Sequence, residues 1–143
     1  MLGMKSLGFR RYATSFWASS YRRRIMQDKP IIKTAIPKRR YQISDYSASL
    51  LGEIESGDAR NFRYILAFVA MGQGEPTLYV CSEQSPPNEA DQGRYRLLIV
   101  NESMSEVMDQ ADRWGDLDAF ADQAVQLGIQ VLGLQREQVM RLL

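Results

Sequence analysis

Hydrophobic and polar residues alternate with a period of two along residues 46–55, a pattern typical of a strand with one buried face. Tyr46, Ala48 and Leu50 fall on one side, and serine and glutamate side chains fall on the other. Gly52 interrupts the pattern and indicates a bulge. Further strand-like segments follow at residues 62–71, 77–83 and 94–100. Two of the three connections are short turns, so these four segments predict an antiparallel meander.

After residue 100 the spacing of apolar residues changes to three and four. Ser103 and Glu106 match a capping box, which predicts the start of a helix. The stripe that follows has helical spacing and consists of Met104, Val107, Met108, Ala111 and Trp114. Asp116 and Gly133 suit the two ends of a second helix. Residues 134–143 fit a short third helix.

Strands followed by helices predict an α+β domain over residues 41–143. We expect an antiparallel sheet of about four strands, with two or three C-terminal helices packed on one of its faces. Because no helical pattern separates the strands, parallel βαβ units are disfavoured. A chain of 143 residues with 45% hydrophobic content suffices for one such core.

The net charge of +1 conceals a division between a basic and an acidic part. Residues 1–40 hold eleven of the 18 lysines and arginines but a single acid, Asp28. Residues 26–40 contain two prolines and are expected to form an extended arm or linker. Residues 1–25 contain no acid at all. This asymmetry predicts a basic tail on an acidic domain.

Three interpretations of residues 1–25 remain open. The segment resembles a mitochondrial presequence in being rich in arginine and serine. Its aromatic residues between arginines would also suit an arm that binds nucleic acid or a membrane. Alternatively, translation starts at Met26 and the segment is not native. The candidate contacts with nucleic acid or a partner are Arg10, Arg11, Arg22, Arg23, Arg24, Arg39 and Arg40.

The composition argues against most catalytic chemistry. The chain has no histidine and a single cysteine, Cys81, which excludes serine triads, cysteine–histidine dyads and the usual zinc sites. Cys81 lies in the middle of a strand and is expected to be buried. Gly72 and Gly74 lack the longer fingerprint of a nucleotide-binding loop. We therefore predict no cofactor and no metal.

No stretch of about 18 apolar residues exists, so no transmembrane helix is predicted. A lone cysteine without an export signal favours the cytoplasm. The presequence interpretation would instead place the protein in mitochondria.

Two pairs of charged residues are the remaining candidates for a ligand-binding or ion-pair face. Glu53 and Glu55 share one face of a strand, and Arg94 and Arg96 share one face of another. The sequence favours a non-catalytic protein-interaction or accessory module, acting as a homodimer or in a larger complex. One alternative is a nucleic-acid-binding protein that uses the basic arm. The other is a ligand-binding or enzymatic domain that works with arginine, glutamate and tyrosine.

Overall fold

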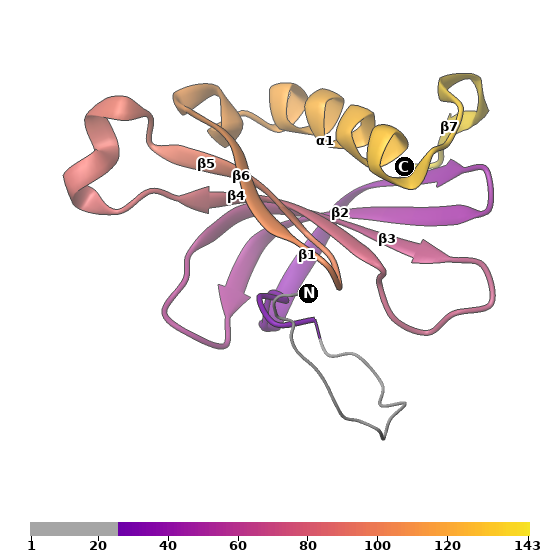
Figure 1. Cartoon of the computed structure of the whole chain (residues 1–143), viewed down its shortest axis with the longest axis horizontal. Helices are drawn as coiled ribbons and strands as arrows, with labels where there is room; N and C mark the ends of the chain where they lie inside the picture. The colour runs from indigo at the N-terminus through magenta and orange to yellow at the C-terminus, as the bar shows by residue number, and fades with distance from the viewer. Residues whose placement is uncertain (1–25) are drawn as a thin grey trace, which may run out of the picture.

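The computed structural model describes residues 26–143, which form a seven-stranded sheet with one α-helix across it (Figure 1). The strands are β1 (Ile32–Ile43), β2 (Tyr46–Ser56), β3 (Phe62–Ala70), β4 (Leu78–Gln84), β5 (Tyr95–Val100), β6 (Ser105–Ala111) and β7 (Val139–Arg141). The helix is α1 (Leu117–Leu132), and 3₁₀ turns cover Pro87–Gln92, Asp112–Gly115 and Arg136–Gln138. Every neighbouring pair in the sheet order β6-β5-β4-β3-β2-β1-β7 is antiparallel.

The predicted architecture of about four strands and two or three helices is wrong, although the chain is α+β in broad terms. The four strand-like segments form β2, β3, β4 and β5. Three more strands join them, and the described residues contain a single α-helix. Two of the additional strands, β6 and β7, replace segments that we expected to be helical.

The helix expected from Ser103 to Trp114 is instead a turn, the strand β6 and the start of a 3₁₀ turn. The Asn101 side-chain oxygen accepts hydrogen bonds from the backbone amides of Ser103 and Met104 and from the Ser103 hydroxyl. The Ser103 hydroxyl is therefore used in a turn and does not cap a helix. This turn reverses the chain after β5 and places β6 beside it, where β6 completes the backbone hydrogen bonds of β5.

The second predicted helix is confirmed at both ends. The Asp116 carboxylate accepts a hydrogen bond from the Ala119 amide at 2.9 Å, and Gly133 ends α1 in the left-handed conformation with φ of 68°. The expected third helix is wrong. Its residues form a 3₁₀ turn and then β7, which pairs with the end of β1 from Tyr41 to Ile43.

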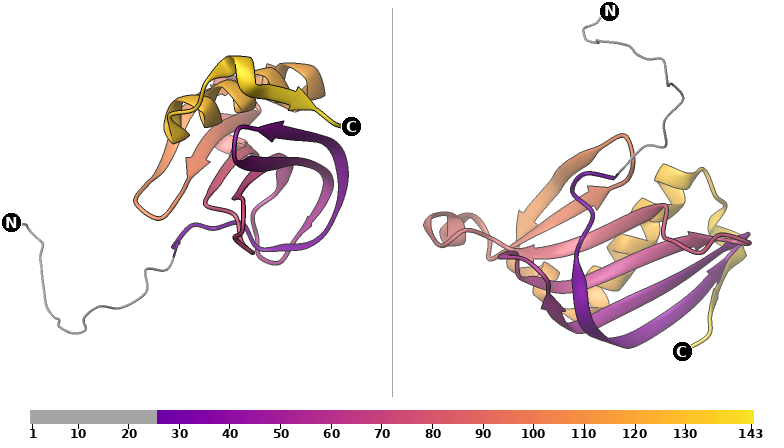
Figure 2. Two further views of the ribbon diagram at one scale, coloured as in Figure 1. Left: turned by 90° about the vertical axis from the view of Figure 1, so that its right-hand side faces the viewer. Right: turned by 90° about the horizontal axis from the view of Figure 1, so that it is seen from below.

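The strand β1 includes residues 32–40, which the sequence pattern assigned to an extended arm or linker. Its pairing with β2 shifts register at three points, and Glu53 has a positive φ of 47° at one of them. Bulges of this kind bend a strand and increase its twist. As Figure 2 shows, β1 and β2 curl strongly relative to the flatter central strands.

The curled sheet has a hydrophobic cluster on each face. The larger cluster lies under α1, where Phe120, Ala124 and Leu127 pack against the central strands. Gly128 lies directly over the ring of Phe68, and this close approach leaves no space for a side chain on the helix. The smaller cluster on the opposite face includes Phe62, Ile65, Cys81 and Leu98 and is flanked by Met26, Ile32 and Ile54.

Candidate interaction edge

The arginines proposed for the basic arm fall into two groups. Arg10, Arg11, Arg22, Arg23 and Arg24 lie outside the described residues. Arg39 and Arg40 belong to β1, where the Arg39 side chain forms an ion pair with Asp118 of α1. Arg40 is exposed, and its backbone carbonyl accepts a hydrogen bond from the Leu142 amide. Arg39 thus connects the sheet to the helix.

The other four candidates do not converge on one site. Glu53 and Glu55 lie on β2, whereas Arg96 lies on β5 and Arg94 just precedes it, and β3 and β4 separate the two strands. Cross-strand pairing between the acids and the arginines is therefore impossible. Each side chain instead pairs with a nearer residue: Glu53 with Lys38, Glu55 with Lys33, Arg94 with Asp112 and Arg96 with Glu89.

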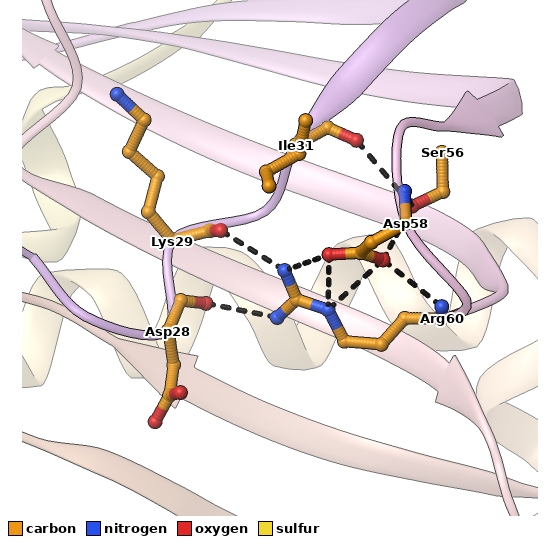
Figure 3. Close-up of polar contacts among 6 residues, drawn as sticks. All are labelled: Asp28, Lys29, Ile31, Ser56, Asp58 and Arg60. Carbon is orange, nitrogen blue, oxygen red and sulfur yellow. Dashed lines mark hydrogen bonds and ion pairs between the residues drawn. The ribbon is translucent and has the colours of Figure 1, made fainter.

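A cluster around Arg60 holds the start of the described chain against the sheet (Figure 3). The Arg60 guanidinium donates hydrogen bonds to the backbone carbonyls of Asp28 and Lys29 at 3.0 and 3.1 Å. It also pairs with the Asp58 carboxylate at 2.7 Å. The carbonyl of Ile31 accepts a hydrogen bond from the Gly57 amide. Asp28, Lys29 and Ile31 are therefore fixed to the turn between β2 and β3.

The hollow beside this arm has a volume of about 810 Å³ and lies between the arm, the β3–β4 turn and the β5–β6 turn. Lys29 and Glu75 on its wall form a 3.8 Å ion pair, and both side chains are exposed. Ser82 and Ser85 are the buried polar residues of the described chain, and neither lines this hollow. The hollow thus lacks the buried polar groups that orient ligands in most small-molecule sites.

The strongest candidate for a functional surface is β6, which lies at one edge of the sheet (Figure 2). Within residues 26–143, no strand pairs with its outer side. Two large apolar side chains in the middle of β6 are exposed to solvent, Val107 by 52% and Met108 by 45%. Edge strands commonly avoid this combination, because an exposed apolar edge attracts another strand.

A bulge in β6 determines which way its side chains point. Leu97 pairs with Asp109 and Leu98 pairs with Val107, so Met108 is the additional residue between them. Leu97 belongs to the cluster under α1, and directly opposed residues share a face. Asp109 therefore faces the helix side of the sheet, whereas Val107 faces the opposite side.

A small groove runs between β6 and α1 on the helix side. Its apolar walls are Leu97, Met108, Trp114 and Leu127, and Gln123 of α1 lies at its border. The groove has a volume of about 230 Å³. This is smaller than the roughly 300–1,000 Å³ of typical small-molecule pockets and suits a single protein side chain.

Polar contacts at one end of the groove hold its shape. The Asp109 carboxylate accepts hydrogen bonds from the Trp114 indole N–H at 3.0 Å and from Arg113 at 3.3 Å. The Arg113 guanidinium stacks over the Trp114 ring at 4.5 Å from its centroid. The buried Ser82 hydroxyl donates to the Trp114 carbonyl at 2.7 Å. These contacts fix Trp114 as a rigid wall of the groove.

Sequence reasoning assigned Val107 and Met108 to the apolar stripe of a helix and so missed this surface. Cys81 is fully buried, as expected, and burial raises the pKa of its thiol. No group of three or more histidine, cysteine, aspartate or glutamate residues with metal-binding geometry occurs in the described part of the chain.

No helix within residues 26–143 has the length and apolar character needed to span a bilayer. Comparisons with models of protein families, with curated proteins and with solved structures found no match to this chain.

Proposed function

We propose that the chain is a non-catalytic protein-interaction module that works in a complex through the outer edge of β6. The observation that carries the proposal is the exposure of Val107 and Met108 on a strand whose outer side is unpaired within the described residues. Adding a strand to such an edge satisfies backbone hydrogen bonds and removes both side chains from water.

The size of the edge is consistent with strand addition as the mode of association. The strand β6 spans seven residues, a typical length for one strand of a sheet. The groove between β6 and α1 adds a pocket for one side chain of the incoming strand. Main-chain pairing with a side-chain pocket beside it supplies affinity and specificity together.

Size analysis of the protein in extracts of its source tests the proposal. We expect the full chain to migrate as an assembly larger than a 16.4 kDa monomer. The Met108→Lys variant should shift toward the monomer, because an added strand would have to remove the lysine ammonium from water beside the apolar walls of the groove. Met71→Lys is the matched control, since Met71 is 71% exposed in the β3–β4 turn. The proposal would be contradicted by a monomeric wild-type chain, or by an equal change in apparent size in the two variants.

A further inference from the structure

The β6 edge presents its backbone in a way that a partner strand can use directly. A hydrogen bond from the Asn101 amide to the Met104 carbonyl closes the β5–β6 turn at 2.9 Å. In an antiparallel ladder, hydrogen-bonded and non-hydrogen-bonded pairs alternate from such a point. Ser105 and Val107, opposite Val100 and Leu98, therefore direct their N–H and C=O groups away from β5. These groups lie on either side of Glu106.

The charge beside this backbone is negative. Glu106 pairs with Ile99, which belongs to the cluster under α1, so Glu106 and Asp109 lie on the same face of β6. Arg113 partly balances Asp109. Within residues 26–143, Glu106 is exposed and takes part in no ion pair. A lysine or arginine on an added strand would balance this charge.

We infer that β6 accepts an extended segment of a different polypeptide, which places an apolar side chain in the α1–β6 groove and a lysine or arginine opposite Glu106. This inference rests on the proposed function and specifies the chemistry of the partner. Residues two apart on a strand point to the same face. The segment therefore has the sequence pattern basic–any–apolar in one strand direction, or apolar–any–basic in the other.

Charge also distinguishes this partner from a second copy of the chain. Two copies paired edge to edge through β6 would bring Glu106 and Asp109 of each copy to one short interface. Like charges on directly opposed strands are unfavourable. The same acidic side chains attract a basic partner strand, and this attraction should weaken as the salt concentration increases.

Selection from a phage-displayed library of random decapeptides on the full chain tests the inference. We expect enrichment of peptides with lysine or arginine two positions from leucine, isoleucine, valine, methionine or phenylalanine. The most enriched peptide is then synthesised with a fluorescent label and titrated by anisotropy. Glu106→Lys and Met108→Lys should each weaken its binding about tenfold, which corresponds to roughly 1.4 kcal/mol.

Two matched controls address general effects of charge and of an exposed lysine. Asp45→Lys, at an exposed position in the β1–β2 turn, and Met71→Lys should bind the peptide like the wild type. N-methylation of the backbone amides of the peptide should abolish binding, because the added strand needs these donors.

The outcomes separate this inference from the proposed function. If Met108→Lys disrupts the native assembly but selection returns no basic and apolar pattern, the partner chemistry is wrong and the function stands. Self-association of the pure chain through β6 would likewise contradict the inference that the partner is a basic segment of a different polypeptide. If the native chain is monomeric and no peptide is selected, both proposals fail.

Discussion

Replacing Gly128 by alanine tests how closely α1 packs on the sheet. A Cβ atom at this position would lie 2.6 and 2.7 Å from the Cε1 and Cε2 atoms of the Phe68 ring. Real Cβ contacts are ordinarily longer than 3.4 Å. Phe68 is fully buried, so its ring has no free space into which to move. The helix must therefore rise from the sheet or the ring must leave its preferred rotamer.

Two opposing effects determine the free energy of unfolding of the Gly128→Ala variant. Alanine stabilises a helix interior by about 1 kcal/mol relative to glycine. Overpacking of a dense core costs roughly 1–3 kcal/mol and occasionally more. Because the contact involves a buried ring directly beneath the helix, we place the packing cost at the upper end of that range. The expected net destabilisation is about 2 kcal/mol, or roughly 5–10 °C in melting temperature.

Urea and thermal denaturation, followed by circular dichroism, measure this change. Gln126→Ala is the control, because Gln126 is an exposed residue of the same helix and its replacement should have little effect. Combining Gly128→Ala with Phe68→Leu should cost less than the sum of the two single changes, since the smaller side chain relieves the contact. A Gly128→Ala variant as stable as the wild type, or strict additivity in the double variant, would refute this account of the packing.

Three further predictions concern the polar and buried groups of the sheet. Arg60→Ala should accelerate hydrogen exchange of the Gly57 amide, which donates to the Ile31 carbonyl, and lower the free energy of unfolding by about 1–2 kcal/mol, because the carbonyls of Asp28 and Lys29 lose their donor. Unchanged exchange of this amide would show that other contacts hold the arm. The Arg60 side chain and amide hold the pKa of Asp58 well below its usual value of 3.8, so the stability that Asp58 contributes is complete above that value and is lost as the pH falls through the folded-state pKa. Chemical denaturation of Asp58→Asn at several pH values should therefore show a deficit against wild type at pH 7 that shrinks below pH 3.8, and a deficit independent of pH would count against this role. The Cys81 thiol should resist alkylation by iodoacetamide in the native protein and react after unfolding, since burial raises its pKa and blocks access; rapid native labelling, read by mass spectrometry, would be incompatible with this position.

The local pattern of residues was sufficient to predict the four central strands and the long helix. Apolar and polar residues alternate over the first half of β2, which identifies it as a strand, and the buried runs of β3 and β4 lie between clear turns. Asp116 and Gly133 act through contacts within one helical turn, so their effect is visible in the sequence alone. The burial of Cys81 likewise followed from its position in an apolar strand.

Pairing between distant segments decided the remaining elements and the candidate site. Spacings of three and four between Met104, Val107 and Ala111 fit a helix, yet the turn at Asn101 and the unpaired edge of β5 select a strand. The edge of β1 selects β7 in the same way. Such choices depend on which backbone groups still need a partner once the sheet has formed, and local propensity does not contain that information. The exposed β6 edge and its groove exist only because of these pairings, so they emerge from the tertiary structure and not from the order of residues alone.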